Sequence, residues 1–122
     1  MNIIFGDAVN ILPKEHLALE LDTVIVKPMD HKVKTWCVVE QLTAEDFKNL
    51  DRNKLRHNDL LTQYRSRSWD NALLAISQLK GCWNSELDSF YEVLEKRIQQ
   101  LRDTPPDQDW DGCIVKFANV EK

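Results

Sequence analysis

The chain has 122 residues, a length that suits one hydrophobic core, and we expect a single domain over residues 1–122. Its formal net charge is −4, and acidic and basic residues are mixed along the chain, which argues against a general nucleic-acid-binding protein. The sequence contains no run of about 18 apolar residues and no basic segment that leads into an apolar stretch. We therefore expect no membrane span, no secretory signal and a cytoplasmic location.

Apolar runs in the first third of the chain predict strands. A short strand is expected over residues 1–5, where Gly6 ends it. Two further strands are expected over residues 18–26 and 32–40. A short loop that contains proline and aspartate separates them, so they are expected to form an antiparallel hairpin.

The alternation of side chains along residues 18–26 predicts which of them share a face of the sheet. Leu19 and Leu21 fall on one face, whereas Val24 and Val26 fall on the other. The end of this strand is therefore expected to be buried on both faces or to be covered by a helix.

The second half of the chain is predicted to be helical. Thr43, followed by acidic residues, is typical of a helix N-cap, and Pro105 and Pro106 stop the last helix. Apolar residues at helical spacing predict four helices, over residues 43–50, 53–66, 69–80 and 85–102.

After these helices, strand character returns over residues 112–118, which predicts a fourth strand in the same sheet. The predicted fold class is α+β, with a small antiparallel sheet packed against a helical hairpin or bundle. Cys37 is expected to be a buried structural thiol. The three cysteines are too far apart in the sequence to predict a disulfide framework or a metal site.

Three stretches carry a family resemblance: GDAVN (6–10), ELDTVIVKPMDHKVKTWCVV (20–39) and YRSRSWDNALLAISQL (64–79). The first is similar to an active-site hairpin of class III adenylate and guanylate cyclases, and the second to the hairpin that closes their catalytic domain. The third is similar to the helical hairpin that often follows it. The resemblance places Asn10 at the position of the asparagine that stabilises the transition state in this family, and common ancestry is one explanation of the likeness.

Other residues that the cyclase family uses for catalysis are missing. Cyclases place two metal-binding aspartates well upstream of the asparagine and a phosphate-holding arginine after it. Here only five residues precede Gly6, and ILPKEH follows Asn10. Phosphoryl chemistry depends on metals and cationic groups, so we expect no enzymatic activity and no cofactor. An alternative is a degenerate cyclase-like domain that binds a nucleotide or small ligand through Asp7, Asn10 and Lys27.

The segments ELDT and WNSELDSFY are also similar to small accessory proteins of marine T4-like phages. This resemblance implies a protein that acts inside an infected bacterium. We therefore predict a non-enzymatic protein-interaction module that acts on a host protein, with homodimerisation as one form of the interaction. A phage structural component is a further alternative.

Large aromatic and cationic residues are the predicted partner-binding residues. Trp83 and Trp110 lie in predicted turns, where they either fold back onto the core or present a binding surface. Arg65 and Arg67 lie near Tyr64 at a helix end. There they suit the helix dipole and could also contact phosphate, although the acidic net charge argues against nucleic acid. The predicted partner-binding set is Trp83, Trp110, Tyr64, Arg65 and Arg67.

The segment DQDWDG places Asp107, Asp109 and Asp111 at alternate positions before Gly112, as in the first half of a calcium-binding loop. Position 12 of such a loop normally holds glutamate, and here it is Ala118. An acidic turn into the last strand is therefore the alternative interpretation. The three histidines show no zinc-binding spacing.

Overall fold

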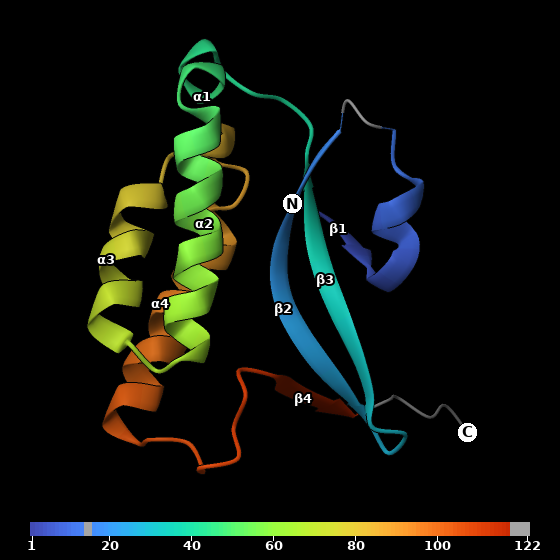
Figure 1. Ribbon diagram of the computed structural model, residues 1–122, viewed down its shortest axis with the longest axis vertical. Coiled ribbons are helices and arrows are strands. Elements are labelled where there is room, and N and C mark those ends of the chain that lie inside the picture. Colours follow the sequence, from blue (N-terminus) through green and yellow to red (C-terminus); the bar gives the residue numbers. More distant parts are fainter. Residues whose placement is uncertain (14–15, 118–122) are drawn as a thin grey trace.

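The computed structural model describes residues 1–13 and 16–117, and it shows a four-stranded sheet with the long helices gathered on one side (Figure 1). In the sheet the strands follow the order β1–β3–β2–β4. None of the described helices is long and apolar enough to cross a membrane. The strands are β1 (Asn2–Phe5), β2 (Leu17–Lys27), β3 (His31–Val39) and β4 (Ile114–Phe117). The α-helices are α1 (Ala44–Lys48), α2 (Leu50–Arg65), α3 (Trp69–Leu79) and α4 (Asp88–Asp103), and the short 3-10 helices are η1 (Gly6–Ile11) and η2 (Trp83–Ser85).

The predicted α+β fold is confirmed, and every predicted helix and strand is present. Residue 118, the last residue of the predicted fourth strand, lies outside the described residues. β3 pairs antiparallel with both β1 and β2, which confirms the predicted hairpin. β4 pairs with β2 in parallel, so the sheet is mixed and not wholly antiparallel as predicted.

The direction of β4 follows from the loop that precedes it. Arg67 donates hydrogen bonds to the backbone carbonyls of Pro106 and Asp107. Trp110 packs edge-on against an aromatic ring at the end of α2, with ring centroids 5.4 Å apart. Because these contacts hold the loop beside the helices, the chain joins the sheet at Val24 and continues in the direction of β2.

A β-bulge in β2 interrupts its pairing with β3. The register shifts between Glu20 and Thr23, so two residues of β2 lie opposite the single residue Thr35. The hydroxyl of Thr35 holds the bulge: it accepts a hydrogen bond from the Asp22 N–H (3.1 Å) and donates one to the Asp22 carbonyl (3.2 Å).

The bulge corrects the predicted division of β2 into two faces. Leu19 lies opposite Cys37 and Val24 lies opposite Val33, and these two partners share one face of β3. Val24 and Val26 therefore lie on the same face as Leu19, where alternation alone had placed them on the opposite one. A single extra residue in a strand moves every side chain after it to the face opposite the one that simple alternation predicts.

The hydrophobic core lies between the helices and one half of the sheet. Leu19 and Leu21 of β2 and Cys37 and Val39 of β3 are the strand residues in it. The Cys37 thiol is fully buried, as predicted, and burial raises its pKa to about 11. Most of the core comes from the helices, from η2 and from the N-cap residue of α4, Leu87. The other residues of this set are Leu60, Leu61, Tyr64, Ala72, Ala75, Ile76, Leu79, Trp83, Phe90, Tyr91, Leu94 and Ile98.

Helix α1 begins with the predicted cap. Thr43 Oγ1 accepts a hydrogen bond from the Asp46 N–H, and the Asp46 carboxylate accepts one from the Thr43 N–H, which together form a capping box. The same carboxylate accepts hydrogen bonds from the backbone N–H groups of Trp83 (3.0 Å) and Asn84 (2.9 Å). Asp46 therefore connects α1 to η2.

Candidate functional site

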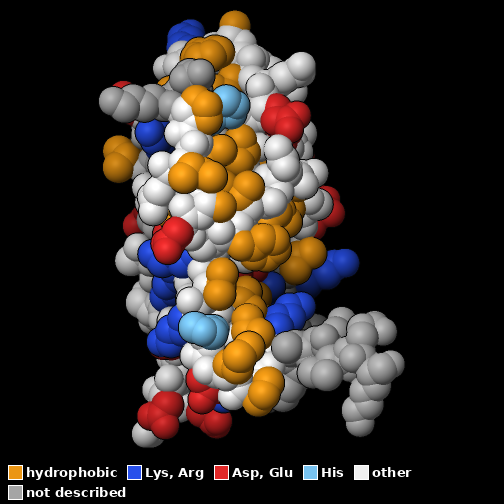
Figure 2. All heavy atoms as spheres, turned by 90° about the vertical axis from the view of Figure 1, so that its right-hand side faces the viewer, with side chains coloured by type: hydrophobic (Ala, Val, Ile, Leu, Met, Phe, Trp, Pro, Cys, Tyr) orange, Lys and Arg blue, Asp and Glu red, His pale blue; other side chains and the backbone are white. Residues whose placement is uncertain are grey.

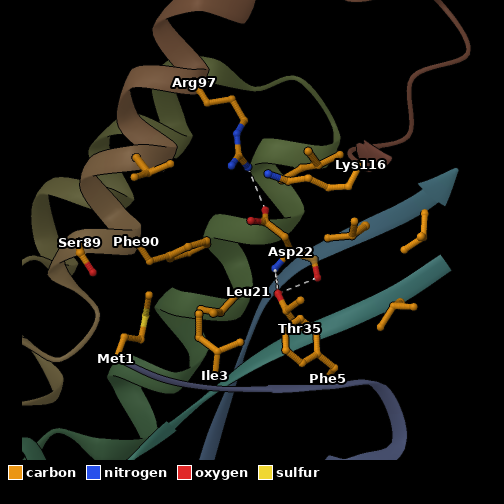
Figure 3. Close-up of a pocket in the computed structure, with 15 residues that line it drawn as sticks. Met1, Ile3, Phe5, Leu21, Asp22, Thr35, Ser89, Phe90, Arg97 and Lys116 are labelled. Carbon is orange, nitrogen blue, oxygen red and sulfur yellow. Dashed lines mark hydrogen bonds and ion pairs between the residues drawn. The ribbon is translucent and has the colours of Figure 1, made fainter. Parts of the chain in front are cut away.

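An apolar groove of about 610 Å³ lies between helix α4 and the half of the sheet that the helices leave uncovered (Figure 3). One wall is formed by Ser89, Phe90 and Val93 of α4. The opposite wall and the floor come from the helix-facing side of all four strands, through Ile3, Phe5, Leu21, Val24, Val26, Val33, Thr35 and Ile114.

The groove exists because the apolar face of the sheet is longer than the helical layer. β2 contributes Leu19 and Leu21 to the core, but after the bulge its apolar side chains continue on the same face without a helix above them. At the edge of this face Phe5 is 63% exposed, and on α4 Val93 is 55% exposed. A contiguous apolar surface of this kind is typical of an interaction site.

One end of the groove is cationic. Arg97 and Lys116 lie at this end, whereas Met1, Ile3 and Phe5 lie toward the other (Figure 3). Arg97 Nη1 donates to Asp22 Oδ1 at 2.9 Å and to the Tyr64 hydroxyl at 3.5 Å. Burial on its own would lower the pKa of Arg97, but the charge of Asp22 together with the hydrogen bonds to Tyr64 and Asp22 outweighs burial and raises this pKa. Arg97 is therefore a permanent cation.

The opposite side of the molecule, which carries η1, has a different surface. Figure 2 shows hydrophobic side chains in a narrow, broken band along this side, flanked by charged side chains. Ile11, the last residue of η1, is 85% exposed. The lining of the groove beside α4 is mostly apolar, whereas that of the hollow beside η1 is mixed, and we take the groove as the candidate site.

Of the predicted partner-binding residues, Trp83 is fully buried, so the prediction that it presents a binding surface was wrong. Its indole Nε1–H donates to the Tyr91 hydroxyl at 3.0 Å. Trp83 therefore folds back onto the core, the other possibility that its position in a turn left open. The left-handed backbone of η2, with φ of 58° at Trp83 and 53° at Asn84, turns the side chain inward.

The other four predicted residues come together at the junction of α2 and the loop before β4, mainly as structural contacts. Tyr64 is only 3% exposed, so it is a core residue and not part of a binding surface. Arg65 forms an ion pair with Glu20. The Arg67 guanidinium lies 5.7 Å from the centre of the partly buried Trp110 ring, which also packs on Tyr64. Trp110 therefore fastens the loop to the helices.

The residues predicted to bind a nucleotide or small ligand are not brought together. Asp7 and Asn10 line a shallow hollow beside β3, together with Lys32 and Lys34. Lys27 does not line this hollow, and it forms an ion pair with Asp30 in the hairpin turn. The GDAVN segment forms most of the 3-10 helix η1, not an active-site hairpin.

The three aspartates of the candidate calcium loop, Asp107, Asp109 and Asp111, do not form a metal site. Among residues 1–13 and 16–117 the structure has no group of three or more His, Cys, Asp or Glu side chains that could hold a metal ion. Asp111 instead accepts hydrogen bonds from the Cys113 N–H (3.1 Å) and from Lys32 Nζ (3.0 Å). These contacts with Cys113 and Lys32 lower the pKa of Asp111, so its carboxylate acts as an anchor between the loop and β3.

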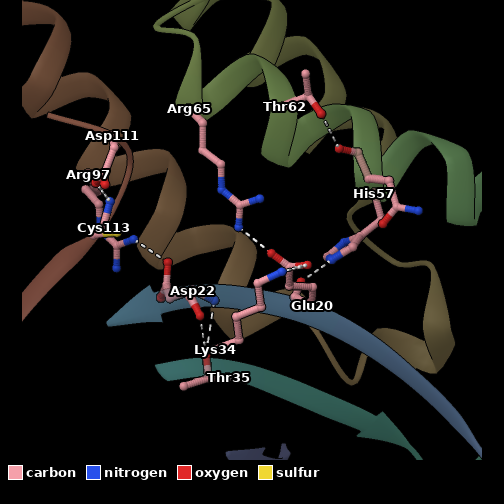
Figure 4. Close-up of polar contacts among 11 residues, drawn as sticks. Glu20, Asp22, Lys34, Thr35, His57, Thr62, Arg65, Arg97, Asp111 and Cys113 are labelled. Atoms are coloured by element: carbon pink, nitrogen blue, oxygen red, sulfur yellow. Dashed lines mark hydrogen bonds and ion pairs between the residues drawn. The ribbon is translucent and has the colours of Figure 1, made fainter. Parts of the chain in front are cut away.

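A buried polar chain connects the helices to β2, and Figure 4 shows its contact between His57 and Glu20. His57 is fully buried, and its Nε2 lies 2.6 Å from the Glu20 carbonyl oxygen. A carbonyl can only accept, so Nε2 carries the proton and Nδ1 accepts from the Tyr91 hydroxyl at 2.9 Å. The Tyr91 hydroxyl in turn accepts from Trp83. Every donor in this chain has an acceptor, so His57 is a structural residue in its neutral form.

The stability of the protein is expected to fall as the pH drops below about 6.5, because burial lowers the pKa of His57 in the folded state. Between the two pKa values the unfolded chain binds more protons, so the free energy of unfolding decreases toward lower pH, by at most about 1.4 kcal/mol per pH unit. Urea denaturation between pH 5 and 8 (about 25 °C) measures this slope.

His57→Gln is the control for this titration, because glutamine retains a donor and an acceptor but does not titrate. The difference between the wild-type and variant curves isolates His57 from the exposed His16 and His31. Parallel curves below pH 6.5 would show that His57 is not held neutral by the fold.

Sequence reasoning missed the groove residues. Val93 and Arg97 on α4 do not belong to the buried stripe formed by Phe90, Leu94 and Ile98. The sequence did contain one signal for the groove. Val93 is an apolar residue that lies outside the regular apolar stripe of α4, and such a residue indicates a second contact surface on the helix.

The structure thus offers an apolar groove with a cationic end, and it assigns most of the predicted aromatic and acidic residues to structural contacts. The resemblances to cyclases and to phage accessory proteins stay predictions. No protein-family model, curated protein or solved structure matches this chain.

Proposed function

We propose that this chain is a non-enzymatic protein-interaction module whose binding site is the groove between α4 and the sheet. The uncovered half of the sheet carries this proposal, because an apolar sheet face is normally buried against a second layer. Here Phe5 and Val93 remain more than half exposed at its borders. A segment of a partner protein would supply the missing cover.

The resemblance to phage accessory proteins supports a bacterial host protein as the partner. In that setting the chain acts by occupying a surface of the host protein, and no chemistry by the chain itself is required. A bacterial lysate is therefore the appropriate source from which to isolate the partner.

Val93→Glu is expected to weaken partner binding by about tenfold or more, because it places a charge on the apolar wall of the groove. The partner is first identified by photocrosslinking in a bacterial lysate, with a photoreactive amino acid at the exposed groove residue Ser89. The dissociation constant of the purified partner is then measured with the wild type and with the variant.

Leu74→Glu is the matched control. Leu74 is 59% exposed, is helical like Val93 (55% exposed), and does not line the groove. Both variants should keep a melting temperature close to that of the wild type, and only Val93→Glu should lose the partner. Equal affinities for the two variants would overturn the groove as the binding site.

Small-ligand binding is a second candidate function, supported by the volume of the groove. About 610 Å³ lies within the range of roughly 300–1,000 Å³ that small-molecule sites occupy. A ligand of this kind at 100 times its dissociation constant would stabilise the protein by about 2.7 kcal/mol. A thermal shift with nucleotides, cyclic nucleotides or fatty acids that Val93→Glu abolishes would favour this candidate over the protein partner.

A further inference from the structure

We propose that the partner segment in the groove is an amphipathic α-helix with acidic residues at one end of its apolar stripe. The inference rests on the proposed function and adds the chemistry of the partner. It follows from the shape of the helix that forms one wall, from the floor of the groove and from the charge at its end.

Helix α4 presents a second, half-exposed ridge beside its buried stripe. Ser89, Val93 and Arg97 are spaced four residues apart and all line the groove. Rows of side chains at this spacing are the ridges that fit into the grooves of a neighbouring helix. The small side chain of Ser89 and the exposed Val93 leave room for such a neighbour at the apolar end of the ridge.

The floor of the groove also suits a helix better than an extended strand. A strand adds to a sheet by hydrogen bonding along an edge, whereas the groove exposes a face of the sheet, where backbone groups are already paired. Val24, Val26 and Val33 form this face with β-branched side chains. A helix with one apolar stripe would pack there, beside α4, as a further member of the helical layer.

Arg97 gives the groove its preference for acidic groups. Both of its hydrogen bonds use Nη1, to Asp22 and to Tyr64. Among residues 1–13 and 16–117, no acceptor contacts its Nη2 or Nε groups, so a carboxylate could bind these donors without breaking the ion pair with Asp22. Guanidinium groups bind a second carboxylate well because they present several donors in one plane.

Lys116 adds a second cation at the same end (Figure 3). Among the residues that the structure describes, Asp22 is the one acidic residue that lines the groove, so Arg97 and Lys116 give the described part of this end a net positive charge. At the opposite end the lining side chains among the described residues, those of Met1, Ile3 and Phe5, are apolar. A complementary helix therefore has acidic residues at one end and only apolar contacts at the other.

Synthetic helices of about 16 residues, stabilised by a covalent staple, test this directly. All carry the same apolar stripe, and they differ only at two positions at one end of it, which hold Glu, Gln or Lys. Each peptide is made in two versions, one with the variable positions at the N-terminal end of the helix and one with them at the C-terminal end. The two versions test both orientations of a helix in the groove. Fluorescence anisotropy gives the affinity, and amide chemical shifts locate the bound peptide.

We expect one Glu peptide to bind in the groove about tenfold or more tightly than its Lys counterpart, with a preference that weakens as salt increases. Lys116→Glu, at an exposed position, should reduce this ratio several-fold, and Arg97→Lys should retain more of it than Arg97→Gln. Val93→Glu should weaken all peptides, whereas Leu74→Glu should weaken none.

Two results would overturn the acidic helix and leave the proposed function intact. One is groove binding with no preference between Glu and Lys peptides, and the other is binding of the crosslinked host partner through a segment that is not helical. A partner that binds Val93→Glu as well as the wild type would overturn the groove itself. Concentration-dependent dimerisation that Val93→Glu abolishes would identify the occupant as a second copy of the chain and contradict the proposal.

Discussion

Replacement of Trp83 by alanine is expected to lower the free energy of unfolding by about 4 kcal/mol. The side chain is fully buried in the core, so its removal leaves a large cavity among the helices. It also takes a hydrogen-bond donor from the buried Tyr91 hydroxyl, which accepts from the indole at 3.0 Å. Urea denaturation followed by far-ultraviolet circular dichroism measures the loss.

Two other tryptophan substitutions separate the parts of this effect. Trp83→Phe keeps most of the ring but not the indole N–H, and it should cost about 1–2 kcal/mol. Trp110→Ala, at a partly buried position in the loop, should cost less than Trp83→Ala. If Trp83→Ala lost less than about 1 kcal/mol, the side chain could not be packed as the structure shows.

This result also decides how binding experiments are interpreted. A tryptophan in a turn invites substitution as a test of partner binding, but the loss of binding by Trp83→Ala would report unfolding. Val93→Glu and Leu74→Glu avoid this problem, because both side chains are more than half exposed. An interface test in this protein depends on residues of α4 that face the groove.

Local sequence signals predicted the elements of this fold well. The helices have apolar residues at helical spacing. The N-cap of α1 is indicated by Thr43 and the acidic residues after it, and in the structure they form a capping box. The hairpin of β2 and β3 follows from alternation and a short turn. These features depend on contacts between residues close in sequence.

The candidate site could not be predicted, because it depends on contacts between distant residues. The bulge at Asp22 is held by Thr35 of the neighbouring strand, and it moves Val24 to the groove face. The parallel direction of β4 depends on Arg67 and Trp110, which hold the preceding loop against the helices. Side-chain alternation within one strand contains no information on either contact.

Trp83 illustrates the same limit in a turn. Its place in a predicted turn left open whether the side chain is exposed or folds back onto the core. Three successive residues of η2 adopt positive φ angles: 58° at Trp83, 53° at Asn84 and 61° at Ser85. Each such residue costs about 1–2 kcal/mol relative to the right-handed conformation. The backbone keeps this shape because a carboxylate from α1, far away in sequence, binds its N–H groups.

That carboxylate belongs to Asp46, and its replacement by alanine is expected to lower the free energy of unfolding by about 3–5 kcal/mol. Asp46 is 6% exposed and accepts hydrogen bonds from the N–H groups of Thr43, Trp83 and Asn84 at 2.9–3.0 Å. Its loss removes the capping box of α1 and leaves the strained backbone of η2 without its acceptor. Chemical denaturation of the two proteins at pH 7 measures the difference.

The effect is expected to disappear in acid. Burial would raise the pKa of the Asp46 carboxyl, but the hydrogen bonds from Thr43, Trp83 and Asn84 outweigh burial and lower it below 3.8. The stabilisation by the charged form is therefore complete above about pH 4 and is lost as the pH falls through the folded-state pKa. Wild type and Asp46→Ala should converge in stability over that range.

Thr43→Ala is the control for the capping box alone, since it removes the hydroxyl that accepts from the Asp46 N–H and leaves the contacts to η2 in place. It should cost about 1 kcal/mol. A similar loss for Thr43→Ala and Asp46→Ala would mean that the carboxylate acts only as a helix cap. A much larger loss for Asp46→Ala would show that one buried side chain holds η2 in its left-handed form and so keeps Trp83 in the core.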